Sequence, residues 1–193
     1  MKTIIVTGKS GSGKTFVANK IAAELGCPVL SLDEVSHQSL TLAPVKQFVK
    51  ETFGESVFDD GEVNRKKLGA IAFSNPDKLQ LLNDVCHQEM LKIIDKHLND
   101  SQDEYFVLDY LLLPEMKYFE TAFFKVLVKA DTHTRKTRII ARDNISETYF
   151  ESRDAHSINF DENTFDYVFE NSKACDISDL ISTIKTAKMS KKS

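Results

Sequence analysis

Near its amino terminus the chain carries a phosphate-binding loop motif, or P-loop, with the sequence Gly8-Lys9-Ser10-Gly11-Ser12-Gly13-Lys14-Thr15. It matches the pattern G-x-x-x-x-G-K-[ST] at every fixed position. The apolar, β-branched run 3–7 before it is typical of a buried strand. The apolar spacing over 16–25 predicts a helix, which Gly26 would terminate. Because the motif stands between a strand and a helix, we expect this segment to bind a nucleotide.

The residue types of the P-loop fit the chemistry of polyphosphate binding. Its glycines let the backbone approach the phosphates and turn N–H groups inward, and the following helix points its positive end at the same place. We expect Lys14 to reach the β- and γ-phosphates and the Thr15 hydroxyl to bind Mg²⁺. The residues predicted to bind a nucleoside triphosphate here are Gly8, Gly11, Ser12, Gly13, Lys14, Thr15 and Phe16. Kinases, GTPases and motor ATPases share the motif, so it does not specify the reaction.

Short apolar runs recur along the chain and alternate with helical patterns. The runs cover residues 3–7, 29–32, 105–109, 123–128 and 167–169. This alternation predicts a three-layer α/β fold with a five-stranded parallel sheet. Ligands of such sheets gather at the carboxyl ends of the strands, where the P-loop, Asp33 and Asp109 fall.

The stretch between residues 32 and 105 is too long for a single crossover helix. It has helical patterns of its own over 44–53, 64–73 and 77–98, and Asn75-Pro76 is a helix-start signal for the last of them. We interpret residues 34–100 as a helical substrate-binding insertion in one domain that spans 1–193. The alternative is a packing elaboration of the same core.

Residues 132–157 are rich in basic side chains and poor in large apolar ones. Arg138 and Arg142 are four residues apart, so on a helix they share a face. A basic helix can close over bound phosphates and stabilise the group being transferred, which makes this segment a candidate lid. The alternative is a solvated surface helix whose cations pair with Asp143, Glu147 and Glu151.

Two carboxylates at predicted strand ends are candidates for acceptor and metal chemistry. Asp33 follows the run 29–32, where it can take a proton from an acceptor hydroxyl or hold a water on Mg²⁺; the alternative is a helix N-cap. Asp109 follows four apolar residues, as in the Walker-B arrangement that orients magnesium; the alternative is an ordinary strand-end acid. His37 and His87 are ambiguous by residue type, and for His87 a structural histidine is the default.

The composition is that of an ordinary globular protein, with 41% hydrophobic and 28% charged residues and a net charge of −4. It gives no sign of nucleic acid or membrane as a partner. The cysteines Cys27, Cys86 and Cys175 are odd in number and widely spaced, so we expect reduced thiols and a cytoplasmic location. The lysines in 186–193 are interpreted as a flexible basic tail rather than a binding patch.

Over nearly the whole chain, from Thr3 to about Asn171, the sequence resembles the dephospho-CoA kinase family. The family's opening is matched by residues 11–15 (GSGKT) and 25–30 (LGCPVL), and Ser31-Leu32-Asp33 stands at its D-x-D. The family's insertion pattern is matched by 53–65, Leu68, Phe73 and 82–87, a signal more specific than a P-loop. The run 107–115 stands at V-x-D-x-P-L-L-[FY]-E, and 138–143 at the lid's R-x-x-x-R-[DN].

The resemblance implies a P-loop kinase fold and a function. The family phosphorylates the ribose 3′-hydroxyl of dephospho-CoA from ATP, giving coenzyme A and ADP. By this likeness Asp33 would be the general base, and Lys14, Arg142 and Arg138 would stabilise the transferring group. The resemblance implies that His37, Arg65, His87 and Asp109 bind the substrate. It implies that Asn171 lies near the adenine of the nucleotide. We expect a monomer or a weak homo-oligomer.

Several positions depart from the family pattern. Ser31 replaces the first Asp of D-x-D, Gln88 the Pro after the histidine, and Leu111 the Pro of P-L-L, while Pro114 is unexpected. Ser157 stands near the place of the family's Gln after the lid. These departures keep two alternatives open. One is another small-metabolite or nucleoside kinase of the same fold, and the other is an ATP-binding regulatory protein without turnover.

Overall fold

A parallel sheet of five strands carries the P-loop at its carboxyl edge. The computed structural model describes residues 1–111, 116–155, 157–172 and 176–187. The chain divides into two units: unit 1 comprises Met1–Ser31 and Gln102–Ser193, and unit 2 comprises Leu32–Ser101. The sheet belongs to unit 1, and unit 2 is mainly helical.

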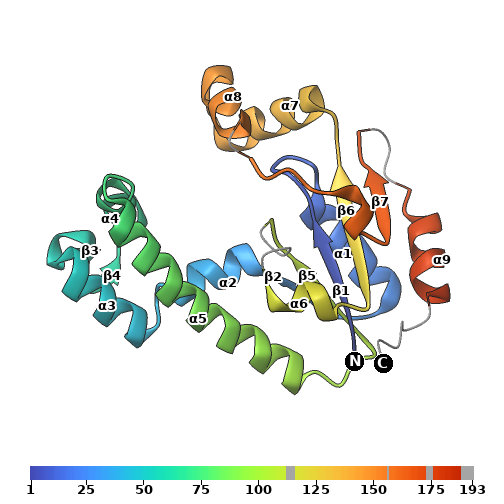
Figure 1. Ribbon diagram of the computed structural model, residues 1–193, viewed down its shortest axis with the longest axis horizontal. Helices are drawn as coiled ribbons and strands as arrows, with labels where there is room; N and C mark the ends of the chain where they lie inside the picture. The colour runs from blue at the N-terminus through green and yellow to red at the C-terminus, as the bar shows by residue number, and fades with distance from the viewer. Residues whose placement is uncertain (112–115, 156, 173–175, 188–193) are drawn as a thin grey trace. The chain divides into compact units, whose positions relative to one another are not determined.

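The strands of unit 1 lie in the spatial order β2-β5-β1-β6-β7 (Figure 1). Their bounds are β1 Lys2–Thr7, β2 Val29–Ser31, β5 Tyr105–Asp109, β6 Phe124–Lys129 and β7 Tyr167–Glu170. All pairings are parallel, and Asp109 at the end of β5 is in register with Val6 on one side and Ser31 on the other. The carboxyl ends of β1, β2 and β5 therefore meet at one edge, beside the P-loop.

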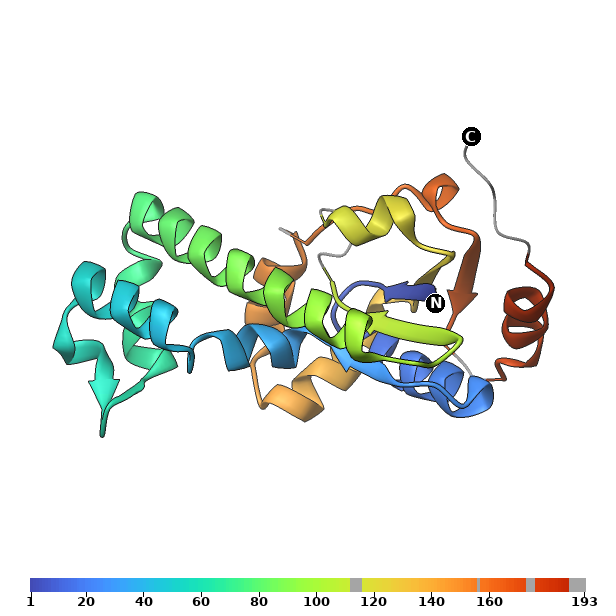
Figure 2. The same cartoon turned by 90° about the horizontal axis from the view of Figure 1, so that it is seen from below.

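Helices cover both faces of this sheet, which explains why its strands read as continuous apolar runs. On one face α1 (Lys14–Leu25) and α9 (Ser178–Thr186) contribute Ile21 and Leu180 to a core shared with Ile4 and Val6 of β1. Figure 2 shows α6 (Lys117–Thr121) on the opposite face. Ile5 lies between Ile4 and Val6 in β1, so its side chain points to the opposite face, and it is also fully buried. The predicted three-layer α/β fold with a five-stranded parallel sheet is confirmed.

Two further helices of unit 1 follow β6 and lie beyond the carboxyl edge of the sheet (Figure 1). They are α7 (Thr132–Asp143) and α8 (Glu147–Ala155), and a short 3₁₀ helix, η3 (Glu162–Thr164), comes before β7. Asp131 caps α7 by accepting from the Thr134 N–H, and hydrogen bonds from Thr134 lower the pKa of Asp131 to about 2. Asn144, in a left-handed conformation with φ of 51°, ends α7 and turns the chain toward α8.

Unit 2 is a helical body with a small hairpin. Its helices are α2 (Leu32–Ser39), α3 (Ala43–Phe53), η1 (Glu55–Val57), α4 (Arg65–Ala72) and α5 (Pro76–Asp100), and its hairpin pairs β3 (Phe58–Asp59) with β4 (Glu62–Val63). Val45, Val49, Leu68 and Leu82 meet in an apolar core of its own. Asn64 and Asn75 cap α4 and α5 with their side chains, as Asn favours at helix starts.

The structure corrects one predicted boundary with a consequence for function. The run 29–32 forms a strand only over Val29–Ser31, and Leu32 begins α2. The ladder stops because Ser31 pairs with Asp109, the last residue of β5, so a fourth residue would have no partner. Asp33 was predicted to follow a strand, with a helix N-cap as the alternative. It has neither position, because it lies in the first turn of α2.

Some sequence features fall outside the described residues. These are Leu112, Leu113, Pro114 and Glu115 of the family-like run, His156 near the end of the predicted lid, Cys175, and the tail residues 188–193. Cys27 and Cys86 carry free thiols, and burial raises the pKa of Cys27 to about 11. Among the described helices, none has the length and apolar character needed to cross a membrane.

Candidate nucleotide-binding site

Close approaches of the backbone explain the glycines of the P-loop. A Cβ at Gly8 would lie 2.2 Å from the carbonyl oxygen of Val128. Gly13 has a φ of 89° and begins α1, and a Cβ there would lie 2.3 Å from Nδ2 of Asn171. No side chain caps α1 and its first turn has no acidic residue, so its N–H groups suit an anion.

Side chains outside the P-loop hold its carbonyl oxygens. Arg138 Nη1 donates to the carbonyls of Gly11 and Ser12, both at 3.2 Å, and Asn171 Nδ2 donates to that of Ser12 at 2.8 Å. Arg138 Nη2 also donates to the Asn171 carbonyl at 2.9 Å. In a trans peptide the C=O and the next N–H point in opposite directions. The Gly13 N–H is therefore turned away from these donors.

A pocket of about 190 Å³ opens beside the P-loop. It is lined by Gly11, Gly13, Lys14, Thr15, Arg138, Ile139 and Arg142. The side chain of Arg142 is 66% exposed, and its Nε donates to Asp143 at 2.7 Å, a hydrogen bond that lowers the pKa of Asp143. The pocket thus combines backbone amides, a hydroxyl and cations, which is the chemistry that a polyphosphate requires.

Of the other residues predicted in unit 1, Asp109, Asn171 and Ser12 are buried and Phe16 is exposed. Asp109 is 1% exposed and lies between the ends of β1 and β2. Asn171, predicted near an adenine, is 4% exposed and uses its amide on the P-loop. Ser12 is fully buried, and its hydroxyl has no hydrogen-bond partner among the described residues. Phe16, by contrast, is 52% exposed on the first turn of α1.

Four predicted site residues lie in unit 2, which has a pocket of its own of about 320 Å³. Arg65, the first residue of α4, lines this pocket; Asp33, His37 and His87 are exposed and are not among its described lining residues. His87 on α5 is thus not the satisfied structural histidine that residue type alone favours. The rest of the lining is Ser36, Leu40, Leu68, Gly69, Ala72, Phe73, Leu79, Leu82, Asn83 and Cys86.

Sequence reasoning missed two residues that this site uses. Ile139 contacts the P-loop, because a Cβ on Gly11 would lie 3.0 Å from its side chain. Asp154 on α8 pairs with Arg135 of α7. The two residues are 19 positions apart, so neither a helical nor a strand periodicity in the sequence indicates this contact. The apolar spacing within 132–143 was the one available signal for Ile139.

The model of the dephospho-CoA kinase family matches residues 2–176 of the chain. The chain belongs to the dephospho-CoA kinase family. A relative from Aquifex aeolicus, named dephospho-CoA kinase, is 36% identical over 177 residues, which are 89% of this chain and 89% of that protein.

Solved structures show the same fold. A crystal structure from Thermus thermophilus has a TM-score of 0.77 and 27% identity, and the match covers 90% of each chain. The dephospho-CoA kinase from Campylobacter jejuni has a TM-score of 0.64 at 21% identity, covering 96% of this chain and 94% of that one, and shows the fold alone. The predicted P-loop kinase fold and the resemblance to the dephospho-CoA kinase family are confirmed.

The two ends of α1 offer a matched test of the P-loop of this dephospho-CoA kinase family member. In Gly13→Ala the new methyl meets Asn171, so we expect nucleotide affinity to fall by roughly tenfold or more. Gly26→Ala is the control, because Gly26 has a similar left-handed backbone with φ of 62° but no atom within 4 Å of the added Cβ. Calorimetric titration with ADP measures both, and equal affinities would contradict the packing argument.

Proposed function

We propose that this protein transfers the γ-phosphoryl group of ATP to the ribose 3′-hydroxyl of dephospho-CoA, giving coenzyme A and ADP. The observation that carries the proposal is the P-loop, whose carbonyls are held from outside while Lys14 and Thr15 line the adjoining pocket. Membership of the dephospho-CoA kinase family supports the choice of acceptor.

The donor side of the reaction rests on residues of unit 1. The P-loop N–H groups and Lys14 bind and aim the phosphates, and Arg142 stabilises charge on the group in transfer. Arg138, whose guanidinium bonds three carbonyl oxygens, fixes the loop rather than the moving phosphoryl group. The helices α7 and α8 form the proposed lid. The ion pairs of Lys136 with Glu147 and Glu151 and of Arg142 with Asp143 also fit the surface-helix alternative.

Thr15 and Asp109 fit a magnesium ion by the chemistry of their oxygen atoms. The exposed Thr15 lines the phosphate pocket, and Asp109 ends β5 at the same edge of the sheet. A bound Mg²⁺ would neutralise charge on the β- and γ-phosphates.

The acceptor side rests on residues of unit 2. Asp33, exposed in the first turn of α2, is the proposed base that orients or deprotonates the 3′-hydroxyl. The apolar lining of the unit 2 pocket suits the uncharged arm of the acceptor, and Arg65 at its edge suits the acceptor's anionic groups. His37 and His87 are proposed to help bind the same substrate.

The direct test is a coupled assay of ADP release with ATP, Mg²⁺ and dephospho-CoA, run beside nucleoside acceptors. We expect rapid ADP release only with dephospho-CoA, and a loss of several orders of magnitude in kcat for Lys14→Ala. Turnover confined to a nucleoside would favour another kinase of this fold. Binding of ATP without transfer to any acceptor would favour a regulatory protein.

Asp33→Asn tests the proposed base. We expect kcat to fall roughly 100- to 10,000-fold, the range for loss of general base catalysis, with the ATP dissociation constant nearly unchanged. The neighbouring exposed acid gives the control Glu34→Gln, which should retain wild-type turnover. Wild-type kcat in Asp33→Asn would remove this carboxylate from the mechanism.

Arg65→Ala tests the acceptor pocket. Loss of a charged hydrogen-bond donor should raise the KM for dephospho-CoA roughly tenfold while leaving the KM for ATP unchanged. Lys66→Ala serves as control, since Lys66 is exposed on the same turn of α4 and does not line the described pocket. A rise in the KM for ATP, or none for dephospho-CoA, would contradict the assignment.

A further inference from the structure

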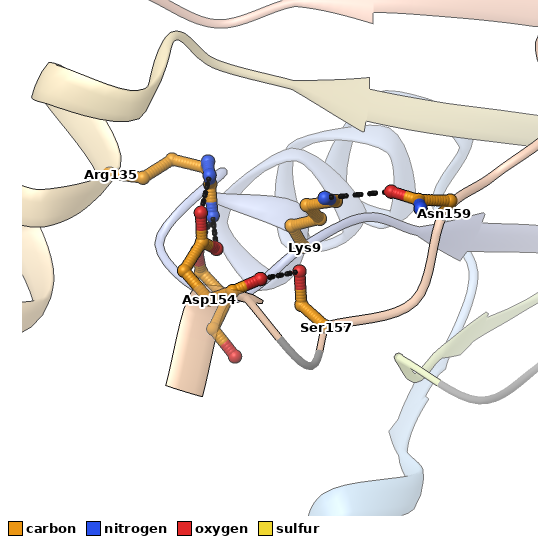
Figure 3. Close-up of polar contacts among 6 residues, drawn as sticks. Lys9, Arg135, Asp154, Ser157 and Asn159 are labelled. Carbon is orange, nitrogen blue, oxygen red and sulfur yellow. Dashed lines mark hydrogen bonds and ion pairs between the residues drawn. The ribbon is translucent and has the colours of Figure 1, made fainter. Parts of the chain in front are cut away.

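We infer that Arg135 and Asp154 are a positioning pair that sets the direction of a P-loop amide, an inference that rests on the proposed ATP-binding role of the loop. Figure 3 shows the two side chains meeting as a fork. Arg135 Nη1 donates to Asp154 Oδ1 at 2.6 Å, and Nη2 donates to Oδ2 at 2.8 Å. Arg135 is only 4% exposed. Such a two-point, buried pair fixes orientation as well as charge.

The fork touches the P-loop directly. Arg135 Nη1 also donates to the carbonyl oxygen of Ser10, at 3.4 Å. The backbone of α7 approaches at the same place, because a Cβ on Gly11 would lie 2.8 Å from the Arg135 carbonyl oxygen. The Ser10 carbonyl and the Gly11 N–H belong to one trans peptide and point in opposite directions. By bonding the Ser10 carbonyl, Arg135 therefore directs the Gly11 N–H away from its own guanidinium. Arg138 and Asn171 direct the Gly13 N–H in the same way, by bonding the Ser12 carbonyl.

Asp154 fixes Arg135 from the opposite side. Both carboxylate oxygens are engaged, so the guanidinium plane cannot rotate away from Ser10 without breaking a charged hydrogen bond. The hydrogen bond from Arg135, then the charge of Arg135 and that of Lys9, lower the pKa of Asp154, so the carboxylate is ionised at neutral pH. Ser157 Oγ donates to the Asp154 carbonyl at 2.7 Å and holds the end of α8 in place (Figure 3).

A second contact braces the same edge of the loop. Lys9 Nζ donates to Asn159 Oδ1 at 3.2 Å, so the P-loop side chain Lys9 is directed to the segment after α8 (Figure 3). Asp154 and Asn159 thus both connect to the loop, the first through Arg135 and the second through Lys9.

The chain contains a matched ion pair between the same two helices. Lys136 Nζ lies 3.0 Å from Glu147 Oε2 and 3.6 Å from Glu151 Oε1, with the Glu147 side chain 69% exposed. Within the described residues this pair has no hydrogen bond to the P-loop. It therefore joins α7 to α8 without the contact that we assign to Arg135.

The experiment compares Asp154→Asn with the control Glu147→Gln in the full-length protein. We expect Asp154→Asn to weaken ADP binding about 10- to 100-fold and to raise the KM for ATP, with the KM for dephospho-CoA unchanged. Glu147→Gln should match the wild type in all three quantities. Should Asp154→Asn not fold, Arg135→Lys applies the same test, because it keeps both charges and loses the fork.

A spectroscopic readout separates positioning from mere stability. In ¹⁵N-glycine-labelled protein, Asp154→Asn should shift the Gly11 amide resonance before ADP is added, whereas Glu147→Gln should not. A lower Tm with wild-type ADP affinity and an unmoved Gly11 resonance would overturn the inference. Failure of the wild-type protein to bind ADP would overturn the proposed function instead.

Discussion

The structure of the site depends on hydrogen bonds made to the outward carbonyl oxygens of the P-loop. A loop that presents several N–H groups to an anion must direct the partner carbonyls elsewhere, and a carbonyl left without a donor is costly when buried. Here Arg138 and Asn171 bond the carbonyls of Gly11 and Ser12, and Arg135 reaches that of Ser10. These donors come from α7 and from the residue after β7. Residues in the second half of the chain therefore hold the P-loop, which lies near the amino terminus.

This arrangement gives the basic residues of α7 different functions. A cationic helix near phosphates suggests that every arginine neutralises phosphate charge. The contacts differ instead: Arg135 and Arg138 donate hydrogen bonds to carbonyl oxygens of the loop, whereas Arg142, which lines the pocket together with Arg138, has a mostly exposed side chain. Of the three, Arg142 alone is therefore proposed to stabilise the group in transfer. In this proposal, positioning and charge stabilisation come from adjacent turns of one helix.

The proposed reaction also divides between the two units. The residues proposed to bind and aim ATP lie in unit 1, whereas Asp33, Arg65 and the apolar pocket proposed for the acceptor lie in unit 2. Unit 2 has its own core around Val45 and Leu82, so its pocket is shaped by packing that is independent of the sheet. Gln88, one of the departures from the family pattern, lies in unit 2. We therefore propose that acceptor specificity can change in unit 2 while the P-loop in unit 1 is kept.

The sequence by itself determined the five strands, the P-loop and the family, because glycine, lysine and apolar periodicity act over a few neighbouring residues. It placed Asp33 at a strand end, and only the register of β2 with β5, which stops at Asp109, decided that this residue lies in a helix. The tertiary structure alone revealed that Asn171 and Asp154 support the loop. These contacts join residues 159 and 19 positions apart, and no local pattern encodes which distant side chain will meet a given carbonyl.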